Sequence, residues 1–271
     1  MGAAVLLQSS TAVAVLASNF ISKRGLATAT GLAILLGADV GSALVTQLLM
    51  VRQPLLIPLL LLIGITIFLR GEGSNTHQVG RIMIGLALIF VSLDMIRSAT
   101  DPMISNPGTQ AVMAYLGHDL LTAFVIGALF AWGVHSSVAA VLLFVTLAGQ
   151  SILPTPAAAT MILGANLGGG LIAFLLTYTA STAVRRMIMC NLILRGGGAV
   201  IAVFVIAEMP DFLDRFGSTP ARQAINLHLA FNLLLAGVSL PFVSLLTAAM
   251  TRLMTDSHNS EDVPQTVSAL D

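Results

Sequence analysis

Apolar stretches of two kinds alternate along the chain. Five are almost unbroken runs and predict plain membrane-spanning helices: residues 54–69, 82–96, 120–132, 187–207 and 224–250. Four more are apolar but are cut by Ser, Gly, Gln, Asn or Asp: residues 3–20, 26–51, 136–147 and 157–183. Interrupted apolar segments at matching positions of two halves indicate broken or re-entrant helices around a binding site. The pattern therefore predicts an all-α integral membrane transporter with re-entrant hairpins and broken helices.

Two short polar sequences each occur twice, with the same spacing. The serine motifs are residues 8–11 (Q-S-S-T) and 135–138 (H-S-S-V), and the glycine motifs are residues 37–42 (G-A-D-V-G-S) and 164–169 (G-A-N-L-G-G). In both copies the glycine motif begins 29 residues after the serine motif. Such internal symmetry is typical of secondary transporters that are built from two repeats.

Loop charges indicate how the two repeats are oriented. Residues 70–81 and 185–186 are basic on balance, whereas residues 97–119 and 208–222 carry more acidic than basic side chains. Placing the basic loops in the cytoplasm makes the corresponding spans of the two halves run in opposite directions, so the repeats are predicted to be inverted. We divide the chain into repeat 1 (residues 1–118, expected to be clipped at its N-terminus, with two plain spans after its motifs), inverted repeat 2 (residues 119–252) and a disordered cytoplasmic tail (residues 253–271).

Composition places the chain in a lipid bilayer. Hydrophobic residues make up 56% of it and charged residues 9%, against about 25% charged residues in a soluble domain. We therefore predict a multi-pass protein of the cytoplasmic membrane. The formal net charge is zero, so no nucleic-acid partner is expected. The single cysteine, Cys190, excludes a disulfide framework and a cysteine metal cluster.

Adjacent hydroxyls in the serine motifs suit a bound ion. Neighbouring side chains on a helix differ in direction by about 100°, so Ser9 and Ser10, or Ser136 and Ser137, converge on one ligand only where the helix unwinds. Hydroxyls both donate and accept hydrogen bonds, and an unwound backbone adds N–H groups for an anion or carbonyls for a small cation. The alternative is that these small residues allow close packing of helices.

The glycine motifs allow two similar interpretations. Small residues permit a tight turn, and Asp39 or Asn166 could then cap a half-helix whose N-terminus attracts an anion. Alternatively, the glycines form a packing face for another helix. An ionisable side chain such as Asp39 at membrane depth is by default a functional hypothesis. Arg195 is either a counter-charge for an anion or a structural partner of Asp39 or Asp94.

Further polar side chains recur at helical intervals and could line the same cavity: Asn191, Asn226, His228 and Asn232. For His228 alone, a hydrogen bond between helices is the favoured interpretation.

The paired motifs resemble those of the sodium/phosphate cotransporter family, the type II sodium-dependent phosphate carriers and their bacterial relatives. That family carries Q-S-S-S/T twice in inverted repeats, each copy followed by G-[AT]-N-[IL]-G-[ST]. Residues 226–232 (N-L-H-L-A-F-N) resemble the H-x-x-F-N segment of the family. The chain departs from the pattern with His135 in place of Gln and Asp39 in place of Asn.

The resemblance implies sodium-coupled symport of inorganic phosphate by alternating access, with uptake as the expected direction. Sodium is then a co-transported ion, no enzymatic activity is expected, and homo-oligomers are allowed. Phosphate is assigned to Gln8, Ser9, Ser10, His135, Ser136, Ser137 and Asn166, sodium to Thr11 and Asp39, and supporting roles to Arg195 and Asn232.

Two alternatives stay open from the residues. One is a sodium-coupled carrier of another small anion or solute, tuned by Asp39 and His135. The other is an intramembrane serine hydrolase that uses His135 or His228, which the absence of a G-x-S-x-G sequence disfavours.

Overall fold

The computed structural model describes residues 9–50 and 55–254, and this part of the chain is built from helices. The helices are α2 (Ser10–Arg24), α3 (Thr28–Leu49), α4 (Leu56–Arg70), α5 (Ser74–Thr100), α6 (Pro107–His118), α7 (Leu120–Gly133), α8 (Ser137–Gly149), α9 (Thr155–Leu176), α10 (Thr182–Glu208), α11 (Pro220–Ser239) and α12 (Val243–Leu253), with the 3-10 helices η1 (Asp101–Met103), η2 (Pro210–Phe216) and η3 (Leu240–Phe242). The predicted all-α architecture is confirmed. The tail predicted from residue 253 onward falls almost wholly outside the described residues.

Five segments of the described chain are long and apolar enough to cross a membrane: Thr28–Leu49, Ser74–Met103, Thr155–Leu176, Thr182–Glu208 and Pro220–Leu253. The last of them contains a break at η3, which divides α11 from α12. These segments confirm a multi-pass membrane protein.

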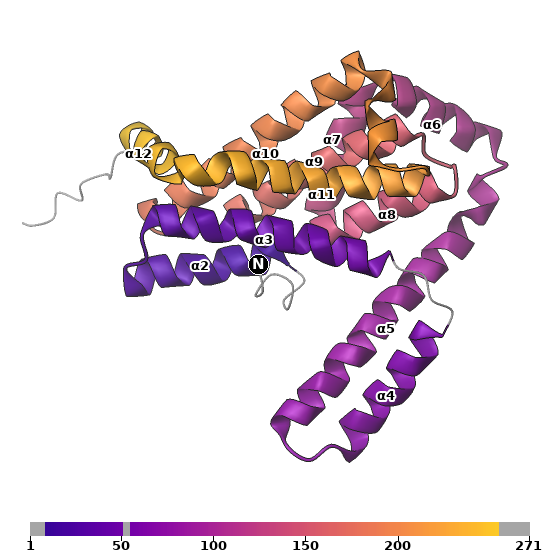
Figure 1. The fold of residues 1–271 in the computed structure, drawn as a ribbon, viewed down its shortest axis with the longest axis horizontal. Coiled ribbons are helices and arrows are strands. Elements are labelled where there is room, and N and C mark those ends of the chain that lie inside the picture. The colour runs from indigo at the N-terminus through magenta and orange to yellow at the C-terminus, as the bar shows by residue number, and fades with distance from the viewer. Residues whose placement is uncertain (1–8, 51–54, 255–271) are drawn as a thin grey trace, which may run out of the picture.

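Two helical hairpins, α2–α3 and α8–α9, have the same spacing along the chain. Helix α8 begins 127 residues after α2, and α9 begins 127 residues after α3. Helices α3 and α9 both contain 22 residues. The hairpins also touch reciprocally, because α2 packs on α9 and α3 packs on α8 (Figure 1). The equal spacing supports two repeats at these hairpins, while the division into repeats and their inverted orientation in the membrane stay predictions.

The glycine motifs do not break their helices. Residues 37–42 lie inside α3 and residues 164–169 inside α9, so the half-helix N-terminus predicted at these positions is wrong. In α9 the glycines instead allow α7 to approach closely. A Cβ atom at Gly164 would lie 2.1 Å from the carbonyl oxygen of Phe124, and one at Gly168 would lie 2.4 Å from that of Ala128. The packing interpretation therefore holds for the second glycine motif.

Two of the predicted plain spans are short helices. Helix α4 has 15 residues and α7 has 14, whereas a helix needs about 20 residues to cross the hydrocarbon core. Helix α7 meets α6 at a bend of 107°. Asp119 fixes this bend, because its carboxylate accepts hydrogen bonds from the N–H of Thr122 at 3.0 Å and from the hydroxyl of Tyr115 at 2.7 Å. The predicted boundary between the repeats, at residues 118 and 119, coincides with the bend.

Helices α4 and α5 form a hairpin that projects away from the bundle at the bottom of Figure 1. Glycines allow its two helices to pack closely, since a Cβ atom at Gly80 would lie only 2.8 Å from the carbonyl oxygen of Gly64. Leu93 near the end of α5 packs with Val45 of α3 and Leu142 of α8. This contact joins the projecting hairpin to a bundle that contains the two motif hairpins, α7, α10 and α11, and the candidate site lies in that bundle.

Candidate functional site

A buried ion pair joins α3 to α10. Nη1 of Arg195 donates to Oδ1 of Asp39 at 2.6 Å, and each side chain is only 4% exposed. Asn191, one turn earlier on α10, lies with its Nδ2 at 3.4 Å from the other carboxylate oxygen. The side chain of Ser10, the first residue of α2, is buried and lies near this carboxylate. The sequence left both Asp39 and Asp94 as partners of Arg195, and the structure selects Asp39.

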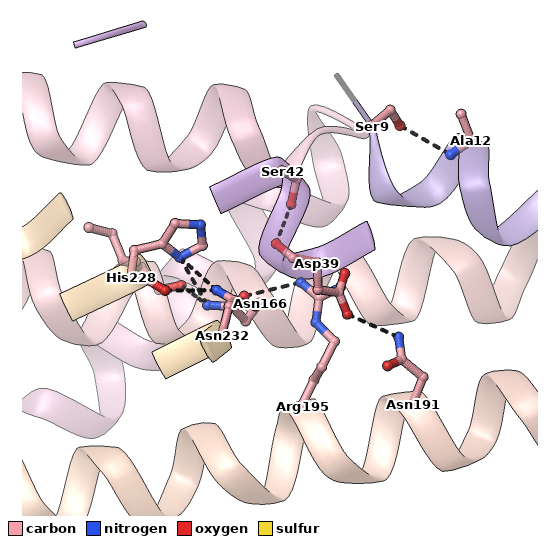
Figure 2. A network of polar contacts seen from close by, with 10 residues as sticks. Ser9, Ala12, Asp39, Ser42, Asn166, Asn191, Arg195, His228 and Asn232 are labelled. Atoms are coloured by element: carbon pink, nitrogen blue, oxygen red, sulfur yellow. Dashed lines mark hydrogen bonds and ion pairs between the residues drawn. The ribbon is translucent and has the colours of Figure 1, made fainter. Parts of the chain in front are cut away.

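Arg195 connects the two hairpins through equivalent positions. Its Nη2 donates to Oδ1 of Asn166 at 3.1 Å. Asn166 follows Asp39 by 127 residues and therefore holds the same place in α9 that Asp39 holds in α3. One guanidinium thus binds a carboxylate of the first hairpin and an amide of the second (Figure 2). The planar fork of Arg suits such a double contact.

The polar network continues to His228 on α11. Because Oδ1 of Asn166 faces Arg195, its Nδ2 faces Nδ1 of His228 at 3.4 Å. Nδ2 of Asn232 lies at the same distance from this ring nitrogen and donates to the backbone oxygen of His228 at 2.8 Å. Both amides present N–H groups, so Nδ1 is the acceptor and the neutral ring carries its proton on Nε2. His228 therefore forms the hydrogen bond between helices that the sequence favoured.

Both serine motifs begin a helix with the same geometry. Oγ of Ser9 accepts a hydrogen bond from the N–H of Ala12, Oγ of Ser136 accepts one from Ala139, and both bonds are 3.1 Å long. The two cap residues have φ and ψ of −154° and 113°, and −152° and 111°. Helical geometry leaves the first N–H groups of α2 and α8 without acceptors inside the helix. Each cap hydroxyl can still donate its own proton, so both helix starts are suited to an anion.

The two helix starts approach the ion pair from different hairpins. Ser10 lies near Asp39, as described above. On the other side, a Cβ atom at Gly169 would lie 3.2 Å from Oγ of Ser137 and 3.4 Å from Nη2 of Arg195. The absence of a side chain at Gly169 therefore allows Ser137 and the guanidinium to lie close to the same point of α9.

Three other predicted site residues are not among the contacts of this network that the structure describes. Gln8 falls outside the described residues, and Thr11 is half-buried in the first turn of α2. His135 is exposed and has a φ of 55°. Nδ1 of its ring lies 3.1 Å from the carbonyl oxygen of Gly133, and the following N–H bonds back to Ala131 at 3.2 Å. His135 thus forms the turn that ends α7, and its contact with substrate stays a prediction.

The sequence indicated only some of the contacts that position the site. Asn191 and Arg195 are one helical turn apart in an apolar segment, which is a visible polar stripe. The bonds of Gln47 and Ser42 had no such signal. Nε2 of Gln47 donates to Oδ1 of Asn226 at 2.7 Å and links α3 to α11. Oγ of Ser42 donates to the backbone oxygen of Asp39 at 2.9 Å.

Comparisons with known proteins match this chain to one family and to several relatives. Residues 1–98 match the family described as Na+/Pi-cotransporter. YjbB of Escherichia coli K12, whose name describes inorganic phosphate export, is 37% identical over 243 residues, which are 90% of this chain and 45% of YjbB. YjbB of Salmonella typhimurium LT2 is 34% identical over 94% of this chain and 47% of its own length. YqeW of Bacillus subtilis, an uncharacterized protein, is 23% identical over 89% of this chain and 78% of its own.

The chain therefore spans about half the length of the YjbB proteins it matches. No solved structure matches the chain.

Proposed function

We propose that this chain carries inorganic phosphate across the membrane by alternating access. The premise is that the chain belongs to the Na+/Pi-cotransporter family. The family and the names of the relatives describe transporters and not enzymes, so the serine hydrolase is set aside. The observation that carries the proposal is the pair of identically capped helix starts, whose next residues, Ser10 and Ser137, lie near Asp39 and Arg195.

Phosphate is proposed to bind between the starts of α2 and α8. Four hydroxyls and the free N–H groups of the first helical turns would donate to its oxygens. The positive end of each helix dipole adds to this attraction. The proposed ligands are Ser9, Ser10, Ser136 and Ser137, with Asn166 beside them and with Gln8 and His135 as predicted contributors.

Sodium is proposed to travel with phosphate and to bind near Thr11 and Asp39. Hydroxyl and carboxylate oxygens are suitable ligands for a small hard cation. A cation next to the anion also offsets the cost of moving a charged substrate out of water. Reciprocal contact between the hairpins supports a site that lies between two repeats, as in inverted-repeat carriers.

Flux through vesicles that contain the purified full chain tests this proposal. We expect radiolabelled phosphate to cross in sodium and to cross far more slowly when choline replaces sodium. Uptake and efflux are both measured, because the relatives are named for export while the family is named for cotransport. Excess sulfate tests the alternative of another anion. Absence of phosphate flux in both directions would contradict the proposal, and flux that is equal in choline would remove sodium from it.

Replacement of Ser10 or Ser137 by alanine should weaken phosphate binding roughly ten- to a hundredfold, because a hydrogen bond to a charged group contributes about 1.5–3 kcal/mol. Isothermal calorimetry of phosphate binding measures the change. Ser92→Ala is the matched control, since this exposed hydroxyl donates only to the backbone of its own helix, at 2.8 Å from Leu88. If both site variants kept the natural affinity, the serines would be packing residues and phosphate would bind elsewhere.

A further inference from the structure

We infer that Asp39 is an internal stand-in for the substrate anion: its carboxylate holds Arg195 while the site is empty, and phosphate takes its place when it binds. This inference rests on the proposed function and assigns Arg195, and not the serines alone, to the anion site. It also couples the two ions, because phosphate releases Asp39 from Arg195 and the freed carboxylate then binds the cation.

The donors that hold Asp39 are those that recognise phosphate. They are a guanidinium at 2.6 Å and an amide at 3.4 Å, with the hydroxyl of Ser10 near by at the N-terminus of α2. Arg, amide and helix N-terminal donors are general ligands for carboxylate and phosphate oxygens alike. A carboxylate of the protein therefore already occupies donors that suit an anion.

The second hairpin has no such internal anion at the equivalent position. Asn166 offers Arg195 a neutral amide oxygen at 3.1 Å where the first hairpin offers a carboxylate. Beside it, Ser137 and Nη2 of Arg195 both lie close to Gly169. An anion bound by Ser137 would thus lie near the guanidinium, on the side where its partner is an amide and not a carboxylate.

Two buried atoms at the pair have spare bonding capacity. Among the described residues, Nε of Arg195 and Oδ1 of Asn191 have no hydrogen-bond partner. Both residues are almost completely buried, at 3% and 5% exposure. A buried polar group without a partner is costly, and it marks a place where a ligand completes the set. The free Arg195 N–H suits an anion, and the free Asn191 oxygen, next to Asp39, suits a cation.

The charges at the site then require Arg195 to exchange Asp39 for phosphate. Arg195 and Asp39 neutralise each other in a site that is shielded from water. An added phosphate would face the negative charge of Asp39 across a medium of low dielectric constant, where like charges repel strongly. Phosphate is accommodated when Arg195 turns to it and a sodium ion on Asp39 and Asn191 balances the released carboxylate. Each ion then raises the affinity for the other, as thermodynamic linkage requires.

Asp39→Asn is the test variant, because it removes the internal anion, preserves the size of the side chain and reproduces the residue found at position 166. Phosphate binding to the purified full chain is measured in sodium and in choline. We expect the natural chain to bind phosphate more tightly in sodium. The variant should bind roughly tenfold more tightly than the natural chain in choline and should no longer respond to sodium. Asp94→Asn is the matched control, since it removes an exposed partner of Arg97 and should behave as the natural chain does.

The outcomes separate the inference from the proposed function. Unchanged or weaker binding by Asp39→Asn, with phosphate bound by the natural chain, would overturn the exchange and leave phosphate transport standing. Failure of the natural chain to bind phosphate in either salt would overturn both.

Infrared difference spectra of the natural chain keep the inference testable if Asp39→Asn does not fold. Added phosphate should shift a carboxylate stretching band in the natural chain and in Asp94→Asn. Phosphate binding without such a shift would show that Asp39 keeps its partner, and the exchange would be wrong.

Discussion

Replacement of Arg195 by glutamine is expected to abolish phosphate binding and to lower the free energy of unfolding by about 3–5 kcal/mol, because it leaves the carboxylate of Asp39 buried without its cation. The variant also loses the bond from Nη2 to Asn166, at 3.1 Å, which ties α9 to α10. Chemical unfolding of the purified protein in detergent measures the stability, and calorimetry measures the binding.

A double variant separates the two effects. Asp39→Asn combined with Arg195→Gln removes both charges, so the free energy of unfolding should recover while phosphate binding should not. Asp94→Asn is again the control. The side chain of Asp94 is 60% exposed in its ion pair with Arg97, and such surface pairs contribute about 1 kcal/mol or less. If Arg195→Gln matched the natural chain in both measurements, the buried pair would support neither stability nor binding.

Replacement of Gly164 by alanine is expected to lower the free energy of unfolding by about 3 kcal/mol, because overpacking against a rigid backbone forces helices apart. The new Cβ atom would lie 2.1 Å from the carbonyl oxygen of Phe124 and 2.9 Å from the backbone nitrogen of Ala128. Neither backbone atom can rotate away as the end of a side chain can. Helix α7 must therefore separate from α9, and Asn166, two residues further along α9, should lose its alignment with Arg195.

Gly237→Ala on α11 is the control for this prediction, since a Cβ atom there meets nothing within 4 Å. It should leave stability unchanged or slightly raised, because alanine favours a helix over glycine. Equal unfolding curves for Gly164→Ala and the natural chain would show that α7 packs less closely on α9 than it does in this structure.

Much of the site was predictable because its signals lie along the chain. The sequence singled out each Ser-Ser pair as a place where a helix would have to unwind, and the structure begins helices there, at Ser10 and Ser137, because serine is a strong N-cap residue. Asp39 was suspected because a charge at membrane depth needs a partner. Its partner could not be chosen from the sequence, since Arg195 is 156 residues away and Asp94 was an equal candidate.

The sequence by itself determined that this is an all-α membrane protein with a duplicated pair of motifs, because hydropathy and spacing are properties of the linear chain. Only the tertiary structure decided what the motifs do. A glycine is equally suited to a turn and to a close helix contact, and the approach of α7 made Gly164 a packing position inside an unbroken helix. Likewise, the rotation and depth of α10 relative to α3 and α9 brought Arg195 between Asp39 and Asn166. Such contacts depend on how separate helices pack, which no local pattern of residues specifies.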